Sequence, residues 1–164
     1  MRTLFTPWRY RYISMSSEAE EGCFFCQAAV APIESEPLVL WRACHHLVML
    51  NRYPYTNGHV MVAPLEHLAD PLQATAEAQA EFWPLVLSCQ RVLSTAYSPS
   101  GFNMGLNLGQ AAGAGVPGHF HFHVVPRWSG DTNFMSVVGS VRLVPETNLD
   151  VARKLRPLFE QELG

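Results

Sequence analysis

The sequence predicts an α+β fold, in which an antiparallel sheet of about five strands carries helices on one side. Three observations predict it. Short runs with strand character follow one another through tight turns, an Ala-, Glu-, Gln- and Leu-rich stretch of helical composition interrupts them, and a shorter helical stretch comes last. Because strands joined by tight turns pair antiparallel, we expect an antiparallel sheet.

Five segments are expected to form the strands. The first three follow one another closely, and the turn between the second and the third is rich in Asn, Pro and Gly. The last two have alternating patterns and lie on either side of a Gly-rich loop. The segments are 37–43, 45–51, 59–64, 101–109 and 119–125.

Two helices complete the expected fold. Asp70 and Pro71 supply an N-cap and a first-turn proline for one long helix that runs to about residue 97. Pro84 is expected to kink or divide it, because a proline removes a hydrogen bond from the helix interior. A C-terminal helix is expected near 149–163, where a second proline argues against continuity.

Length and composition indicate one domain: the chain has 164 residues, of which 48% are apolar and 15% charged. We divide it into an N-terminal arm (1–22), a core that carries the motifs described below (23–128) and a C-terminal extension with a helix (129–164). A net charge of −3 argues against nucleic-acid binding. No apolar run approaches the roughly 20 residues of a membrane span, and the N-terminus lacks the apolar stretch of a signal peptide. We therefore expect a cytoplasmic protein.

Three histidines alternate with apolar residues in the stretch GHFHFHVVPRW, residues 118–128. Alternate residues of a strand share a face, so His119, His121 and His123 are expected to point one way and the residues between them into the core. Three satisfied histidines on a solvated sheet face are the plain alternative. One metal bound by all three is disfavoured, because the outer Cα atoms lie roughly 13 Å apart while ligands lie about 2 Å from zinc. We expect the three to have different tasks.

A Cys-x-x-Cys pair, Cys23 and Cys26, stands near the N-terminus. In a cytosolic chain this spacing indicates a metal or redox pair rather than a disulfide. No second such pair completes an all-cysteine zinc site, so a metal would require two histidines, and a redox-active pair remains the alternative. Cys44 and Cys89 stand alone and are expected to be core or incidental thiols.

The glycines of GAGVPG satisfy the letter pattern G-x-G-x-x-G of dinucleotide-binding folds. That fingerprint requires a helix after the glycines, whereas Pro117 and the strand-like histidine stretch follow here, so we reject a Rossmann-type site. A flexible turn and a loop whose backbone N–H groups bind an oxyanion remain the two interpretations.

The stretch HFHFHVVPR resembles the signature of the histidine triad (HIT) family of nucleotide hydrolases and transferases. Five further segments resemble parts of its zinc-containing bacterial members: FTPWRYRYI, CFFC, NRYPYTNGHVMVAPLEH, GFNMGLNLGQAAGAG and PRWSGDTNFM. Within the family, the chain most resembles dinucleoside polyphosphate hydrolases and diadenosine tetraphosphate phosphorylases. The resemblance implies a HIT-like fold, a nucleotide or dinucleoside polyphosphate substrate and a homodimer.

The resemblance implies that His121, the middle histidine, is the nucleophile. Neutral imidazole is available near pH 7 and can attack the α-phosphorus to form a covalent AMP-histidine intermediate. By the same resemblance, His123 and His59 donate hydrogen bonds to phosphate and leaving-group oxygens. Taken alone, His59 would be a surface histidine at the end of a strand.

The resemblance also implies a zinc site formed by Cys23, Cys26, His67 and His119. Four protein ligands close a tetrahedral zinc and leave no position for substrate, so this zinc is expected to be structural. It would tie the N-terminal arm to the strand of the nucleophile. The remaining histidines, His45 and His46, are rival ligands by proximity to Cys44, but are expected to be packing or surface residues.

Nucleotide contacts carried over from the family fall on Asn51, Met49, Met61, Asn107 and Gly115. Asn51 matches a polar position that holds the ribose hydroxyls, and the methionines would form an apolar slot beneath the base, although such methionines are usually ordinary core. Asn107 matches a phosphate contact after a one-residue insertion. Where many relatives carry Gln followed by Ser or Thr, this chain has Ala-Gly-Val, so backbone N–H groups around Gly115 must replace those side chains.

The sequence therefore predicts an enzyme that transfers AMP from a dinucleoside polyphosphate, or a related adenylated compound, through His121 to water or phosphate. The Gly-Ala-Gly segment slightly favours phosphate, the acceptor of the phosphorylases. Two other classes compete with this prediction: a zinc-stabilised nucleotide-binding module with little catalysis, and a redox protein that uses the cysteine pair.

Overall fold

The structure, a computed structural model, describes residues 22–33, 35–131 and 144–164. Five strands form one sheet with the order β1-β2-β3-β5-β4, and every neighbouring pair is antiparallel. The strands are β1 (Val39–Arg42), β2 (His46–Leu50), β3 (Val60–Pro64), β4 (Gly101–Leu106) and β5 (Phe122–Arg127). The predicted α+β class and the five-stranded antiparallel sheet are confirmed.

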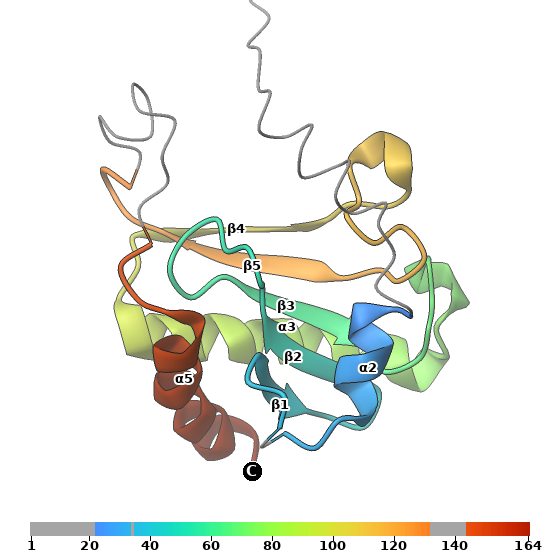
Figure 1. The fold of residues 1–164 in the computed structure, drawn as a ribbon, viewed down its shortest axis with the longest axis horizontal. Helices are drawn as coiled ribbons and strands as arrows, with labels where there is room; N and C mark the ends of the chain where they lie inside the picture. The colour runs from blue at the N-terminus through green and yellow to red at the C-terminus, as the bar shows by residue number, and fades with distance from the viewer. Residues whose placement is uncertain (1–21, 34, 132–143) are drawn as a thin grey trace, which may run out of the picture.

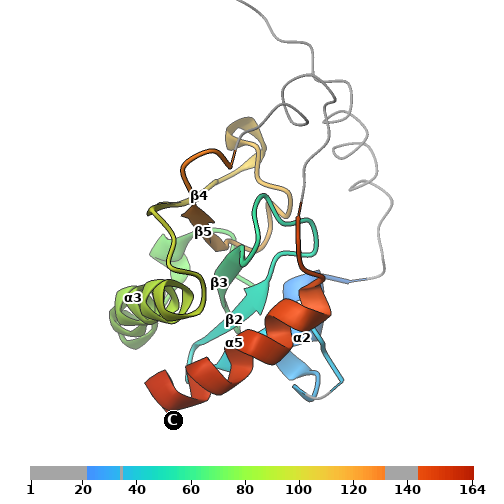
Figure 2. The same cartoon turned by 90° about the vertical axis from the view of Figure 1, so that its left-hand side faces the viewer.

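In the described parts of the chain, three α-helices pack on the sheet: α2 (Phe24–Val30), α3 (Ala76–Tyr97) and α5 (Asn148–Leu163). Figures 1 and 2 show α3 on one face and α2 on the other, while α5 packs against α3 and β1. The expectation that all helices lie on one side is therefore wrong. Helix α2 was not expected, because a helix of 7 residues is too short to show a clear period in the sequence.

The long helix begins later than predicted. Asp70 and Pro71 open a separate 3-10 turn, Pro71–Gln73, in which the Asp70 carboxylate accepts a hydrogen bond from the Leu72 N–H. Helix α3 starts after Thr75, whose hydroxyl accepts a hydrogen bond from the N–H of Ala78. Pro84 does not divide α3, and α5 likewise runs unbroken through its proline. Apolar burial of both helices outweighs the hydrogen bond that each proline removes.

The core surrounds the two central strands of the sheet. All five residues of β2 and all five of β3 are buried, because helices cover both faces. This explains why their sequences are continuous apolar runs instead of an alternation. On α5, Val151, Leu155 and Phe159 follow one another at four-residue spacing and are all buried in the same core.

The histidine stretch enters the sheet later than predicted. Strand β5 starts at Phe122 and not at residue 119, because the preceding backbone bonds outside the sheet: the N–H of His119 donates to the Val116 carbonyl and that of Phe120 to the Leu68 carbonyl. Within β5 the expected alternation holds, since Phe122 belongs to the core while His123 pairs with Met61 on the other face. Phe120 is buried, but it lies outside the main apolar cluster.

Most of the predicted N-terminal arm (1–22) and part of the C-terminal extension (129–164) lie outside the described residues. The division of the chain into three parts therefore stays a prediction. Among the residues that the structure describes, no helix combines the length and apolarity needed to cross a bilayer.

Candidate functional site

Three of the five histidines expected to work on phosphate or zinc form one cluster, called here the histidine cluster: His59, His121 and His123. Pairing of β3 with β5 places them together, because Met61, two residues after His59, is opposite His123. The Nε2 atom of His59 lies 2.9 Å from Nδ1 of His123. The ring centroids of His121 and His123 are 4.9 Å apart. The structure thus brings together the three side chains predicted to be catalytic.

Hydrogen bonds determine which ring nitrogen of each histidine carries the proton. The backbone N–H of Tyr55 donates to Nδ1 of His59 over 3.1 Å, so the proton of His59 lies on Nε2. That Nε2–H donates to Nδ1 of His123. The proton of His123 therefore lies on its Nε2, which makes this side chain a hydrogen-bond donor toward a further acceptor.

His121 is held in the opposite tautomer. Its Nδ1–H donates to the backbone carbonyl of His119 over 3.0 Å, so its Nε2 keeps a lone pair. Burial lowers the pKa of His121, and the hydrogen bond to the His119 carbonyl opposes this only in part. Burial and the neighbouring His121 together lower the pKa of His123 to about 4. Both rings are therefore neutral near pH 7, and His121 has the electronic state of a nucleophile.

Two aromatic side chains cover the cluster. The Phe25 ring of α2 lies 4.7 Å from the ring of His121 and 5.0 Å from that of His119. The Tyr55 ring lies 4.7 Å from that of His59 and is stacked on that of His123 at 6.0 Å. Sequence reasoning assigned no role to either residue. The signal that could have found them is their position, because Phe25 lies within CFFC and Tyr55 within NRYPYTNGHVMVAPLEH, two of the segments that resemble the family.

The predicted metal ligands also meet, in what we call the Cys2His2 cluster: Cys23, Cys26, His67 and His119. Their ligand atoms all lie within 4.8 Å of one another. Sγ of Cys23 is 3.3 Å from Nδ1 of His119, and Sγ of Cys26 is 3.2 Å from Nδ1 of His67. Cys23 is the N-cap of α2 and Cys26 lies in its first turn, so the two thiols face the same side.

The chemistry of the Cys2His2 cluster fits zinc. Nε2 of His119 lies 2.9 Å from the Pro64 carbonyl, to which it donates its proton, and Nδ1 is left to ligate. Burial, with a further contribution from Cys23, raises the pKa of the Cys26 thiol; a divalent ion would offset this by favouring the thiolate. Two thiolates and two imidazoles are the donor set of a closed tetrahedral zinc, which supplies structural cross-linking.

A glycine lets the His67 ring approach the cluster. A Cβ atom added at Gly118 would lie 3.3 Å from Nε2 of His67, closer than most Cβ contacts in proteins. Any larger residue at this position would press on the ring. The last glycine of GAGVPG thus has a packing role beside the histidines, not the phosphate-binding role of a Rossmann turn.

The two methionines expected beneath the base lie on the histidine face of the sheet. Met49 pairs with Met61, and Met61 pairs with His123 on the next strand. Both are buried, so they line up from β2 across β3 toward the histidine cluster. Their arrangement suits an apolar floor, and contact with a base stays a prediction.

The polar residues and the glycine carried over from the family are less buried than the two methionines. Asn51 follows β2, and its side-chain oxygen accepts a hydrogen bond from the N–H of Tyr53. Asn107 is exposed directly after β4, and Gly115 is half-buried in the glycine loop. Their roles in binding ribose and phosphate stay predictions.

The residues expected to be packing, surface or incidental residues lie outside both clusters. His46 is buried, and its Nδ1 lies 2.9 Å from Glu81, which also accepts hydrogen bonds from the N–H groups of Cys44 and His45. Burial lowers the pKa of His46, although Glu81 opposes the shift. Cys89 is buried, which raises the pKa of its thiol, whereas Cys44 is exposed.

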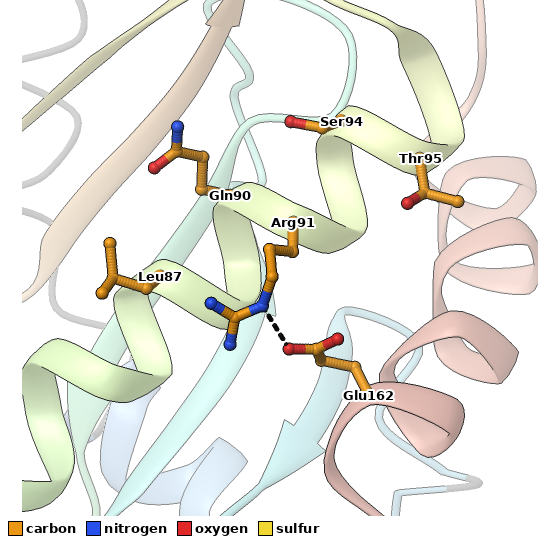
Figure 3. A pocket seen from close by; sticks show the side chains of 6 residues that line it. All are labelled: Leu87, Gln90, Arg91, Ser94, Thr95 and Glu162. Atoms are coloured by element: carbon orange, nitrogen blue, oxygen red, sulfur yellow. Dashed lines mark hydrogen bonds and ion pairs between the residues drawn. The ribbon is translucent and has the colours of Figure 1, made fainter.

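A groove of about 470 Å³ between α3 and α5 lies apart from these clusters (Figure 3). Helix α3 covers the sheet face opposite the histidines, since Phe82 of α3 packs edge-on against Phe122. An ion pair between Arg91 and Glu162 joins the two helices here. The groove is lined by Leu87, Gln90, Arg91, Ser94, Thr95 and Glu162.

Comparison with known proteins agrees with the fold. The family model described as the HIT domain matches residues 34–130. A Mycobacterium tuberculosis protein named AP-4-A phosphorylase is 35% identical over 94% of this chain and 83% of its own length. A Schizosaccharomyces pombe protein named bis(5'-nucleosyl)-tetraphosphatase [asymmetrical] is 30% identical over 72% of this chain and 63% of its own length.

A solved structure points the same way. The structure of a zinc-bound histidine triad family protein from Mycobacterium smegmatis superimposes with a TM-score of 0.67 and 28% identity, covering 87% of this chain and 96% of that one. The fold and the alternating histidines thus define a protein of the histidine triad class. The chain belongs to the HIT domain family.

Proposed function

We propose that this protein is a nucleotidyl hydrolase or transferase that cleaves the α-phosphate linkage of dinucleoside polyphosphates such as diadenosine tetraphosphate. One observation carries the proposal: His121 keeps a lone pair on Nε2, while His123 beside it carries a proton on Nε2. A nucleophile and a proton donor are thus prepared in one cluster. Two relatives whose names specify AP-4-A and bis(5'-nucleosyl)-tetraphosphate support the substrate class.

In the proposed reaction, Nε2 of His121 attacks the α-phosphorus of the substrate. A nitrogen–phosphorus bond forms and the bond from that phosphorus to the bridging oxygen breaks, so that ATP leaves diadenosine tetraphosphate. The Nε2–H groups of His123 and, through it, His59 stabilise the charge that develops on phosphate and leaving-group oxygens. An acceptor oxygen then attacks the AMP-histidine and frees His121.

The remaining predicted residues serve binding and support in this proposal. Met49 and Met61 form the floor under the base, Asn51 holds the ribose, and Asn107 and the backbone of Gly115 hold the phosphate. Zinc on the Cys2His2 cluster holds the segment around His119 next to the nucleophile.

Water and inorganic phosphate are the two candidate acceptors. Water would give AMP, whereas phosphate would give ADP. The relative named AP-4-A phosphorylase favours phosphate, because its similarity extends over 94% of this chain. The Gly-Ala-Gly segment before the histidines supports the same acceptor.

The test is chromatographic product analysis with diadenosine tetraphosphate, with and without inorganic phosphate. AMP and ATP formed without phosphate would establish hydrolysis, and ADP and ATP formed only with phosphate would establish phosphorolysis. If the protein binds the dinucleotide but forms neither set of products, it is a binding module and the proposed reaction is wrong. The control is His121→Ala, which should form neither set.

We also propose that the protein is a homodimer located in the cytoplasm. Strand β4 ends the sheet, and its outer edge pairs with no strand in the described parts of the chain. An open edge of this kind is a template for pairing with a second strand. Light scattering after size-exclusion chromatography should give twice the chain mass of 18.3 kDa; a monomeric mass would refute the dimer.

A further inference from the structure

The loop that precedes β3, residues 51–58, sets the tautomer of His59. Its Tyr55 donates a backbone N–H to Nδ1 of His59 and stacks its ring near both His59 and His123. If the loop moved, Nδ1 of His59 would lose its donor and the two tautomers of that ring would become closer in energy. The position of the loop therefore matters for the proton on Nε2 of His123.

The end of this loop is held by a carboxylate from another part of the chain. One oxygen of Glu146, which lies just before α5, accepts hydrogen bonds from the Asn57 side chain at 2.6 Å and the Tyr97 hydroxyl at 2.9 Å. Its other oxygen pairs with Lys154 of α5. Asn57 is only 9% exposed, so water has little access to replace the carboxylate. Glu146 thus joins the loop to α3 and α5.

The neighbouring loop residue, Gly58, packs against Tyr97, the residue that donates its hydroxyl to Glu146. Gly58 has φ +72°, and a Cβ atom there would lie 3.0 Å from the Tyr97 ring. The Tyr97 ring therefore packs directly against the Gly58 backbone while its hydroxyl donates to Glu146. Only a residue without a side chain fits both the positive φ and this contact. Residues 57 and 58, directly before His59, are held from one side by Glu146 and Tyr97.

The negative charge of the Glu146 carboxylate strengthens its hydrogen bonds to Asn57 and Tyr97. Burial alone would raise the pKa of Glu146, but hydrogen bonds from Lys154, Asn57 and Tyr97 outweigh it and the pKa is lowered. Burial and the adjacent Glu146 raise the pKa of Tyr97, which keeps its hydroxyl protonated and able to donate. An ionised acceptor forms shorter and stronger hydrogen bonds than a neutral one, so the carboxylate is a firm anchor for the loop.

We propose that Glu146 is a positioning residue for His59: through Asn57 and Tyr97 it holds the 51–58 loop so that the Tyr55 N–H stays on Nδ1 of His59. The relevance to turnover rests on the proposed function, in which His59 and His123 act on the phosphate. The tautomer of His59 itself requires no substrate.

The first measurement is the tautomer of His59 in the full-length, zinc-loaded protein without nucleotide. Protein with ¹⁵N-labelled histidine is observed by long-range ¹H–¹⁵N NMR at pH 7.5, with His59→Gln used to assign the signals. The wild type should show an unprotonated Nδ1 and a protonated Nε2. In Glu146→Ala both signals should move toward values averaged over two tautomers, and in Glu146→Gln, which keeps an acceptor oxygen, they should return toward the wild type.

Kinetics with diadenosine tetraphosphate provides the second measurement. Loss of the anchor should lower kcat roughly tenfold and change KM less, because misplacement of a catalytic group weakens mainly the transition state. The matched control is Glu162→Ala, since Glu162 also joins α5 to α3, through Arg91, but lies in the groove of Figure 3 away from the loop. This variant should leave kcat within about twofold and the His59 signals unchanged.

Two results would overturn the proposal: unchanged His59 signals in Glu146→Ala, or equal changes in Glu146→Ala and Glu162→Ala. If Glu146→Ala fails to fold, Tyr97→Phe replaces it, because it removes only the hydroxyl that donates to Glu146, and the same shift in smaller measure is expected. A wild type without turnover would refute the proposed function alone, because the NMR comparison would still decide the role of Glu146.

Discussion

The Cys2His2 cluster and the histidine cluster both take histidines from the stretch 119–123, but the rings of these histidines are used in opposite ways. His119 donates its Nε2–H to the Pro64 carbonyl and turns Nδ1 toward the thiols. His121, two residues later, donates its Nδ1–H to the His119 carbonyl and keeps Nε2 unprotonated. Identical side chains thus obtain different chemistry from the backbone carbonyl that takes the proton.

The two clusters also differ in how the chain assembles them. The Cys2His2 cluster brings together α2, the segment after β3 and the start of the histidine stretch, so a zinc ion held there would cross-link distant segments of the chain. The histidine cluster depends mainly on the register of β3 with β5. Phe25 contacts both clusters. If the proposed function holds, loss of the first cluster should affect mainly stability and loss of the second mainly the reaction.

The largest expected effect is on turnover when the nucleophile is removed. His121→Ala should lower kcat with diadenosine tetraphosphate by at least about 10³-fold, because the proposed covalent intermediate forms on Nε2 of His121. Zinc content, measured by elemental analysis, should stay at the wild-type value because His121 is outside the Cys2His2 cluster. Wild-type turnover in this variant would contradict the proposal that His121 is the nucleophile.

Removal of the proton donor should have the next largest effect. His123→Ala should slow turnover by about 10² to 10⁴-fold, the usual contribution of a positioned acid or base. A fluorogenic or chromatographic assay of kcat is sufficient. His45→Ala serves as the control, since His45 lies outside both clusters, and a similar loss in the control would contradict the specific role of His123.

Removal of a metal ligand tests the structural cluster. Cys26→Ser should reduce bound zinc well below one ion per chain and lower the melting temperature. It should lower turnover by about 10²-fold, since a shift of about 1 Å in a reacting group has that cost. Cys44→Ser is the control, because Cys44 is exposed and outside the cluster. Unchanged zinc content and melting temperature in Cys26→Ser would show that the Cys2His2 cluster is not the zinc site.

The smallest expected effect is a pH dependence of stability. The pKa of His123 falls from an ordinary 6.5 to about 4 in the folded chain, so between these pH values only the unfolded chain binds this proton. The free energy of unfolding should therefore decrease as the pH is lowered from about 6.5 toward 4. Denaturant titrations at pH 7.5 and 5.5, with zinc present at both, should show a smaller difference for His123→Gln than for the wild type. An equal difference in both proteins would contradict the shift.

Much of the fold was predictable because its signals are local. Apolar runs bounded by turn residues located the five strands, and alternation put Phe122 in the core and His123 on the other face. Element ends were less predictable. Helix α3 begins at Ala76 because Thr75 caps it, although Asp70 and Pro71 carry an equally good start signal, which the chain uses for a 3-10 turn.

The sequence by itself determined which residue types are available: an alternating histidine stretch, a cysteine pair at helical spacing and a histidine before a strand. The resemblance to a known family grouped Cys23, Cys26, His67 and His119, and folding brings their ligand atoms within 4.8 Å of one another. Only the tertiary structure decided several of the proton positions, because these depend on partners distant in the chain, such as the Pro64 carbonyl for His119 and Nε2 of His59 for His123. A ring nitrogen is a donor or an acceptor according to what faces it, and what faces it is decided by folding.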